Sequence, residues 1–452
     1  AYGSGDLASN CSYGLVSSFV LLYLTGTLGL DSAIIGSLML ASKVLDGISD
    51  VIFGTLIDRT HSKLGKARPW MLFGQVGVSL CLFLLFAIPA GSTTMQYIYF
   101  FIVYTALNAV FYTANGIAYS SLVALITKNN NERVQLGSFR FMFAVVTNIF
   151  MGFAVTGMVE KFGSGAAGWR TTALIFAIVG LVVNTISCLA VKELPEEELS
   201  GNTSEAAEEG KAVAEEKKHG FAETAKILVH NKYYLMILAI YIVYYIMSNL
   251  TTGAGVFCAT YYWGDGSLLG QFSMMKMFPV IIALAIAPVL IKKTGSMQKV
   301  NFWGYAISSV LGIPMIYFAM QKNLSMFLLF MFIKGIFAGT LSGSLNALIA
   351  EASGYTTRTT GIHMDGMMYS CSSLGVKVGG GIGTAAVGWL LKLGGFVGTA
   401  TVQSESAIRM IFNLYITFPF VIGIIITVLL AFLDVEKANK KWDAEHKKEA
   451  QA

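Results

Sequence analysis

Charged residues are scarce in this chain. Asp, Glu, Lys and Arg make up 13% of its 452 residues, against about 25% in a typical soluble domain. Hydrophobic residues make up 55%, and the mean hydropathy is +0.65. This composition excludes a soluble globular protein of ordinary type and predicts a polytopic membrane protein.

Motifs for catalysis and for metal binding are also missing. The five cysteines stand singly in apolar segments without Cys-x-x-Cys spacing, and the five histidines form no ligand pair. The sequence has no nucleophile elbow, phosphate loop or metalloprotease helix. We therefore expect no enzyme activity and no cofactor, and the net charge of +5 does not indicate a nucleic-acid partner. No leader segment is expected either, because the opening residues are small and polar.

Apolar runs separated by short polar breaks predict twelve membrane spans in an all-α fold. They cover residues 7–30, 33–57, 69–90, 95–126, 138–160, 169–192, 232–262, 268–292, 299–320, 325–350, 363–393 and 406–433. A Glu-, Ala- and Lys-rich linker, 193–231, divides the chain into N-terminal (1–192) and C-terminal (232–433) halves of six spans, followed by a tail, 434–452. Two such halves are typical of the major facilitator fold.

Basic residues gather in the connections that follow even-numbered spans, for example Arg59, Lys63, Lys66 and Arg68 after the second span. By the positive-inside rule, both termini are expected in the cytoplasm. The predicted location is the plasma membrane, where the bilayer itself is a partner. Nothing in the sequence requires more than a monomer.

The second span carries charge at its centre. Lys43, Asp46 and Asp50 share one helical face, and each charge would cost roughly 2.5 to 3.5 kcal/mol at mid-membrane. One lysine cannot neutralise two carboxylates, and carboxylates one turn apart favour uptake of a proton or a small cation. We interpret the group as a coupling-ion site. A structural network that holds helices together is the alternative.

The stretch that begins at Asp46 and continues beyond the second span resembles a known family signature. DGISDVIFGTLIDRTHSKLGKARPW, residues 46–70, resembles the signature of the glycoside–pentoside–hexuronide:cation symporter family of major facilitators. Further stretches agree in order: YGSGDLASN, ANGIAYSSLVALIT, ERVQLGSFRFMFA, YYWGDGSLL and GYTTRTTGIHMDGMMYSCSSLGVKVGGGIGTAAVGWLL. The resemblance covers nearly the whole chain. It implies alternating-access symport of a small-molecule substrate, namely a sugar, glycoside or uronide.

The resemblance assigns coupling residues. Asp46 and Asp50 match the acidic pair that binds the cation, Lys43 matches a basic residue one turn earlier, and Lys377 matches a lysine opposite that pair. Ser49 stands where an Asn ligand is usual, and Tyr112, with Thr113 beside it, stands where a Thr ligand is usual. The changed ligand set leaves both sodium and proton open.

Substrate positions follow from the same resemblance. Asn10 and Asn115 replace acidic residues, as in glucuronide and pentoside carriers of the family; an amide suits a neutral glycoside or a uronide. Tyr119 matches an aromatic residue that stacks on a sugar ring, Arg140 a substrate-contacting arginine, and Tyr369 part of a Tyr-Ser pair. Lys377 is expected to contact the substrate as well as the acidic pair. The alternatives are interhelical hydrogen bonds for the amides, packing for Tyr119 and snorkelling for Arg140.

A gating motif completes the set. Gly54, Asp58 and Arg59, with Arg68 in the Arg-Pro-Trp segment, are expected to latch the two halves at the cytoplasmic face. Two other functions stay open at this stage. One is a carrier of a non-sugar solute such as a lysolipid, and the other is a transporter-like sensor that binds ligand without turnover.

Overall fold

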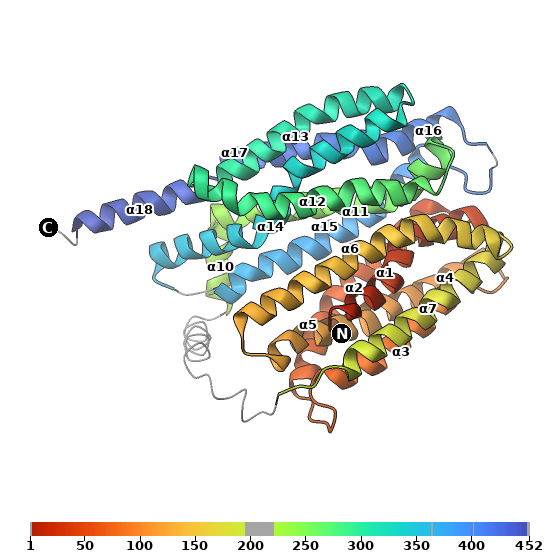
Figure 1. Cartoon of the computed structure of the whole chain (residues 1–452), viewed down its shortest axis with the longest axis horizontal. Helices are drawn as coiled ribbons and strands as arrows, with labels where there is room; N and C mark the ends of the chain where they lie inside the picture. Colours follow the sequence, from red (N-terminus) through yellow and green to blue (C-terminus); the bar gives the residue numbers. More distant parts are fainter. Residues whose placement is uncertain (1, 195–220, 363–364, 401, 450–452) are drawn as a thin grey trace. The chain divides into compact units, whose positions relative to one another are not determined.

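The computed structural model describes residues 2–194, 221–362, 365–400 and 402–449. Within these ranges the chain is helical and contains no strand (Figure 1). Most of the predicted linker, residues 195–220, lies outside the described residues. The prediction of an all-α fold is confirmed.

The helices, with π-helical turns labelled η, follow one another along the chain. They are α1 (Ser4–Leu22), η1 (Tyr23–Thr27), α2 (Ser32–Asp58), α3 (Arg68–Leu85), α4 (Thr93–Thr105), η2 (Ala106–Tyr112), α5 (Thr113–Ile126), α6 (Asn130–Lys161), α7 (Gly165–Leu189), α10 (Phe221–His230), α11 (Lys232–Phe257), η3 (Cys258–Tyr262), α12 (Leu268–Thr294), α13 (Met297–Met320), α14 (Leu324–Thr360), α15 (Asp365–Leu393), α16 (Glu405–Phe412), η4 (Asn413–Thr417), α17 (Phe418–Phe432) and α18 (Val435–Glu449).

Every predicted span corresponds to a long helix in the described part of the chain. Eleven are long and apolar enough to cross a membrane. The remaining one, α2, is not among these eleven, although it is 27 residues long. The largest boundary error is in α14, which was expected to end near residue 350 but continues to Thr360. Hydropathy marks the lipid-facing part of a helix, whereas a polar extension can continue beyond the bilayer.

The chain forms two compact units, which are described separately. The first contains Ala1–Gly201, Asn249–Met274 and Gly381–Tyr415, and the second contains Asn202–Ser248, Met275–Gly380 and Ile416–Ala452. The first unit thus includes end segments of spans from the C-terminal half. The division into two six-helix halves at the linker stays a prediction.

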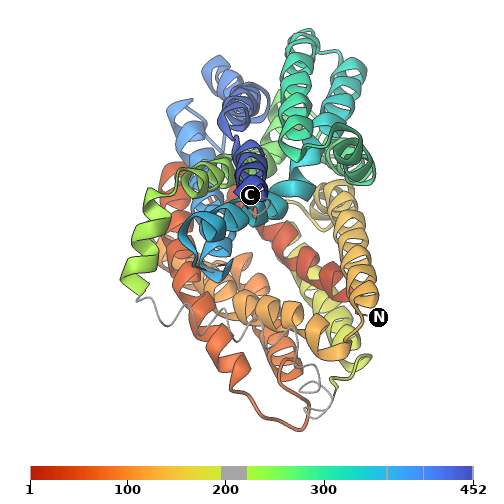
Figure 2. The same ribbon diagram turned by 90° about the vertical axis from the view of Figure 1, so that its left-hand side faces the viewer.

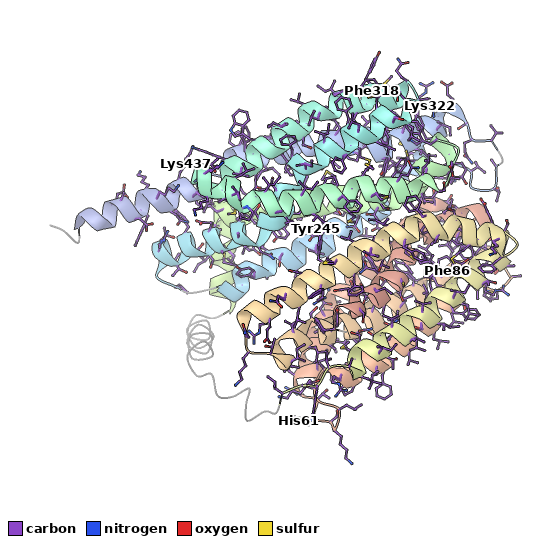
Figure 3. The ribbon with its side chains drawn as sticks, viewed as in Figure 1. His61, Phe86, Tyr245, Phe318, Lys322 and Lys437 are labelled. Atoms are coloured by element: carbon purple, nitrogen blue, oxygen red, sulfur yellow. The ribbon has the colours of Figure 1, made fainter. Side chains whose placement is uncertain are left out.

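Aromatic rings fill one end of the first unit, where α1 packs against α3, α6 and α7 (Figure 1). Phe86, labelled in Figure 3, stacks on Trp169 with ring centroids 5.7 Å apart. Tyr23 packs beside both rings and donates its hydroxyl to the carbonyl of Phe86 at 3.2 Å. This cluster fixes α1 against the helices that position the candidate site.

In the second unit, α13 packs along α14 and α17 (Figure 1). Asn301 on α13 donates its side-chain amide to the hydroxyl of Ser344 on α14 at 2.7 Å, and both residues are buried. The C-terminal α18 follows α17 and points toward the viewer in Figure 2. Buried polar pairs of this kind join neighbouring membrane helices.

A carboxylate caps the first turn of α3. Glu193, just after α7, accepts hydrogen bonds from the backbone N–H groups of Lys66, Ala67 and Arg68 at 2.7, 3.0 and 3.0 Å. The first turn of a helix exposes unsatisfied N–H groups and the positive end of the helix dipole. Glu193 therefore ties the end of the sixth span to the start of the third.

The second unit repeats this device. Glu436, just after the last span, accepts hydrogen bonds from the N–H groups of Met297 and Gln298 at 2.8 and 3.1 Å, and from the hydroxyl of Ser296. These residues begin α13, the ninth span. The twelfth span is thus joined to the ninth as the sixth is joined to the third, which reveals an internal structural repeat.

Glycines bring α2 and α15 into backbone contact in the first unit. A Cβ atom at Gly36 would lie 2.7 Å from the carbonyl oxygen of Ala385, and one at Gly388 would overlap the carbonyl of Ser32. The Ser32 hydroxyl donates to the Gly388 carbonyl at 2.9 Å. Small residues permit such close approach of membrane helices.

An ion pair closes this contact. Lys392 Nζ lies 2.6 Å from Asp31 Oδ2, and Asp31 also caps α2 by accepting from the N–H groups of Ala33 and Ile34. Partial burial alone would raise the pKa of Asp31, but the hydrogen bonds from Lys392 and the two N–H groups outweigh it and lower the pKa. The carboxylate therefore stays ionised and attractive to the lysine.

Gly388→Ala should destabilise the protein because the added methyl group meets the Ser32 carbonyl. We expect a loss of about 1 to 3 kcal/mol, as for other overpacked sites, measured as a lower midpoint of thermal unfolding in detergent. Gly157→Ala on α6 is the control, because no atom lies within 4 Å of its Cβ position. Equal midpoints for the two variants would contradict the close contact.

Candidate functional site

Asp46 lies at the centre of the charged face of α2 and is 9% exposed. Its Oδ1 accepts a hydrogen bond from the Thr113 hydroxyl at 2.6 Å, and its Oδ2 lies 3.4 Å from Lys43 Nζ. Its backbone carbonyl accepts from the Ser49 hydroxyl at 2.9 Å. Four residues that the sequence analysis assigned to the coupling site are therefore in contact.

A π-helical turn shapes the other side of this site. The turn η2 precedes Thr113, whose Oγ1 lies 2.9 Å from the carbonyl oxygen of Asn108 as well as close to Asp46. A threonine hydroxyl has one hydrogen and cannot fully satisfy two acceptors. If Asp46 is protonated, it donates to Thr113, which in turn donates to Asn108. Both contacts of the Thr113 hydroxyl, with Asp46 and with Asn108, are then normal hydrogen bonds.

Two tyrosines line the same region. Tyr112 stacks on Tyr13 with ring centroids 5.1 Å apart, and Lys43 Nζ lies 5.7 Å from the centroid of the Tyr13 ring. Asp50 lies one turn beyond Asp46 and is half-buried. The sequence analysis missed Tyr13, since nothing in the local pattern distinguishes it from the many other tyrosines of the chain.

Arg140 belongs to a second polar cluster in the first unit. Its Nε donates to Asp6 Oδ2 at 2.6 Å, and its guanidinium lies over the Tyr119 ring at 4.2 Å from the centroid. Tyr2 and Tyr119 exchange hydrogen bonds, each hydroxyl donating to the other residue's backbone carbonyl at 2.7 and 2.8 Å. Burial raises the pKa of Tyr2 to about 12, so its hydroxyl remains a donor.

The cluster changes how Tyr119 is interpreted. The residue is 2% exposed, and Arg140 covers one face of its ring. In this conformation the ring offers no open face to a sugar on that side, so stacking requires Arg140 to move. The predicted substrate roles of Tyr119 and Arg140 stay predictions. The partner Asp6 was missed because it lies in a short polar opening segment.

The two candidate amides form hydrogen bonds between helices. Asn10 Oδ1 accepts from Asn148 Nδ2 at 3.0 Å, and Asn115, 3% exposed, donates to Gln75 Oε1 at 2.7 Å. This geometry matches the interhelical alternative, while their predicted contacts with substrate stay untested. Asn148 and Gln75 were missed, although lone amides in apolar spans are a readable signal.

Lys377 and Tyr369 lie on α15 in the second unit. Lys377 is half-buried between Gly375 and Gly379, whose Cβ positions would meet Tyr241 and Ile242 of α11. Two residues from each glycine, Lys377 lies on the side of α15 away from α11. Tyr369 is 41% exposed. The predicted pairing of Lys377 with the acidic residues of α2 stays a prediction.

The gating residues do not form a latch within the first unit. Asp58 and Arg59 are exposed, and no described atom lies within 4 Å of a Cβ position at Gly54. Arg68 instead donates from Nε to the carbonyl of Cys188 at 3.1 Å, which joins the start of α3 to the end of α7. Their predicted role between the halves stays a prediction.

The chain resembles known proteins over nearly its whole length. The family described as MFS/sugar transport protein matches residues 1–437. The chain belongs to this family. It is therefore a multi-pass membrane protein of a transporter family, and the predicted resemblance to sugar symporters is confirmed.

Members of this family from several bacteria resemble the chain over most of its length. The isoprimeverose transporter of Lactiplantibacillus pentosus is 26% identical and is matched over 98% of this chain and 90% of its own length. The putative glycoside/cation symporter YagG of Escherichia coli is 23% identical (97% and 92%), and its glucuronide carrier protein homolog is 23% identical (88% and 83%). A solved bacterial homologue of the lysosomal transporter Spinster matches with a TM-score of 0.69 at 13% identity, covering 98% and 96%, which supports the major facilitator fold.

Proposed function

We propose that this family member is a secondary active symporter that carries a sugar, glycoside or uronide by alternating access. It acts as a monomer in the plasma membrane, with both termini in the cytoplasm. Support comes from the charged face of α2 and from relatives named as isoprimeverose, glycoside/cation and glucuronide carriers. Charged residues inside a membrane span, such as those on this face of α2, often mark the pathway of an ion or a substrate.

The coupling ion in this proposal is a proton carried by Asp46. The observation that supports this choice is that the single Thr113 hydroxyl lies within hydrogen-bond distance of both Asp46 Oδ1 and the Asn108 carbonyl. In addition, Lys43 Nζ lies 3.4 Å from the other oxygen of the carboxylate, a position that a bound metal cation would otherwise take.

The proton then couples to substrate through charge balance. Uptake of a proton by Asp46 removes the repulsion between Asp46 and Asp50, and the neutral site favours the substrate-bound form that changes conformation. Release of the proton on the other side restores both carboxylates and resets the carrier. Coupling arises because forms that carry the proton or the substrate alone change conformation poorly.

Purified protein in proteoliposomes tests this proposal. We expect an inward pH gradient, acid outside, to drive accumulation of radiolabelled xylose, methyl β-D-glucoside or methyl β-D-glucuronide at least about tenfold above the level without a gradient, since one pH unit supplies that factor. A sodium gradient at constant pH should add less than twofold.

Two results would contradict the proposal. Accumulation driven by sodium but not by pH would overturn the proton assignment and keep the symporter. Failure of all three sugars in uptake and exchange, together with thermal stabilisation by lysolipid, would overturn the sugar substrate.

A further inference from the structure

Three polar atoms in the helices around Asp46 have no hydrogen-bond partner among the described residues. They are Ser42 Oγ on α2, Thr105 Oγ1 at the end of α4 and Asn108 Oδ1 in η2. Ser42 is 0% exposed and Asn108 is 1% exposed. An unpaired buried polar atom is costly, and such atoms are commonly satisfied by bound water when no side chain reaches them.

The two hydroxyls also leave a common alternative unused. A serine or threonine inside a helix can donate to the backbone carbonyl one turn earlier. Thr25, Ser37 and Thr147 do this at 2.7, 3.0 and 2.7 Å. Within the described part of the chain, Ser42 and Thr105 make no such bond. Their hydroxyls are therefore free to bind another group.

The helix α2 runs in the same direction as the continuous segment formed by α4, η2 and α5. Near its start, the backbone N–H of Asp31 donates to the Tyr97 hydroxyl at 2.8 Å, and further along Asp46 Oδ1 lies 2.6 Å from the Thr113 hydroxyl. These partners are 66 and 67 residues apart in the sequence. Nearly the same offset therefore holds along the two helices.

This offset places Asn108 at the level of Ser42. Ser42 precedes Asp46 by one turn on the same face of α2, and the carbonyl oxygen of Asn108 lies 2.9 Å from Thr113 Oγ1. Thr105 lies one turn further from Asp46. The three unpaired atoms thus follow the Asp46–Thr113 contact on one side, over about 12 Å at 1.5 Å per residue.

Asn108 lies on the face of its segment that meets the coupling site. Tyr104 and Tyr112 are about one turn before and after it on the same face. Tyr112 stacks on Tyr13, and Lys43 Nζ lies 5.7 Å from the centroid of the Tyr13 ring. Tyr104 also interacts electrostatically with Lys43. The unpaired amide oxygen therefore belongs to the surroundings of the charged face of α2.

The start of this helix pair borders a cavity of about 230 Å³. Asp31 and Tyr97 line the cavity, together with Lys392 and Thr399. Because both termini are proposed to be cytoplasmic, α2 begins on the outer side of the membrane. The unpaired atoms therefore lie on the side of Asp46 that is directed toward the outer face.

We propose that water bound by Ser42, Thr105 and Asn108 forms the inner section of a path that carries the proton between Asp46 and the outer face. This inference rests on the proposed proton symport. A hydroxyl both donates and accepts hydrogen bonds, whereas the amide oxygen only accepts and holds a water in place. At each step one oxygen gains a proton from the oxygen behind it and gives one to the next, so the path keeps its composition when Asp46 becomes protonated.

Thr105→Val tests the path, because valine removes the hydroxyl and keeps the shape of the side chain. Uptake into proteoliposomes under an inward pH gradient is followed over time, with whichever of the three sugars named above the unchanged protein accumulates. The initial rate should fall about tenfold, the factor that corresponds to one lost hydrogen bond. The final level should stay within twofold, because Asp46 still couples the proton to the sugar. Ser42→Ala should show the same pattern.

Two further variants and a second assay separate proton delivery from folding. Exchange without a gradient needs no net proton transfer and should change less than twofold in both variants. Thr105→Ser keeps the hydroxyl and should retain the initial rate. Thr172→Val is the matched control and should also retain it, because its hydroxyl has no partner among the described residues but lies on α7, which packs against α1, α3 and α6.

The possible outcomes distinguish this inference from the proposed function. If Thr105→Val and Ser42→Ala take up sugar as fast as the unchanged protein, the inference is overturned and proton symport stands. An equal loss in exchange, or an equal loss in Thr172→Val, would indicate a general structural effect and would overturn it too. Failure of the unchanged protein to accumulate any of the sugars under a pH gradient would overturn the proposed function itself.

Discussion

Asp46→Asn is expected to abolish gradient-driven accumulation, with a loss of about a hundredfold or more. Asparagine keeps the size of the side chain and can still contact Thr113, but it cannot take up and release a proton. Exchange of substrate without a gradient needs no net proton transfer and should continue. The measurement is uptake in proteoliposomes under a pH gradient, compared with exchange in the same preparation.

This pair of assays separates coupling from misfolding. A misfolded variant would lose both activities, whereas a variant that lacks the coupling group loses accumulation alone. Asp443→Asn on α18 is the matched control, because that carboxylate makes a surface ion pair with Arg358. Accumulation by Asp46→Asn within twofold of the unchanged protein would refute the assignment of Asp46.

Glu193→Ala is expected to lower the free energy of unfolding by about 2 kcal/mol, at the upper end for loss of a helix cap. Three N–H groups at the start of α3 lose their common acceptor. The midpoint of thermal unfolding in detergent should fall by several degrees. Glu160→Ala is the control, since Glu160 is exposed at the end of α6.

The repeat makes a second comparison available. Glu436→Ala removes the equivalent carboxylate from the start of α13 and should destabilise by a similar amount. If Glu193→Ala and Glu160→Ala unfold at the same temperature, the cap contributes nothing and the argument from geometry fails.

The sequence predicted the spans and the acidic face because both signals are local. Hydropathy reports the lipid-facing surface of each helix, and the spacing of Asp46 and Asp50 follows from helical geometry. The sequence did not predict the contacts between helices. Thr113 meets Asp46 across 67 residues of sequence, and Arg140 meets Asp6 across 134. No local pattern encodes which buried partner a side chain will meet.

Two further misses have different physical causes. Ser42 and Asn108 were absorbed into apolar runs, since a single small polar residue barely changes the mean hydropathy of a span. No local pattern distinguishes them from the other small polar residues of the spans. Glu193 was assigned to a solvated linker, because its charged neighbours conceal a cap that becomes visible only when α3 and α7 are placed together.

The carboxylate caps also affect how such a carrier can move. One carboxylate connects the third span to the sixth, and the other connects the ninth to the twelfth. The two spans of each pair should therefore move together as a rigid unit. Deformation is then left to the remaining spans. Three of these contain a wider turn, η1, η2 or η3, where the regular ladder is already interrupted. Bending at η2 would change the Thr113–Asp46 contact directly, because η2 ends at the residue before Thr113.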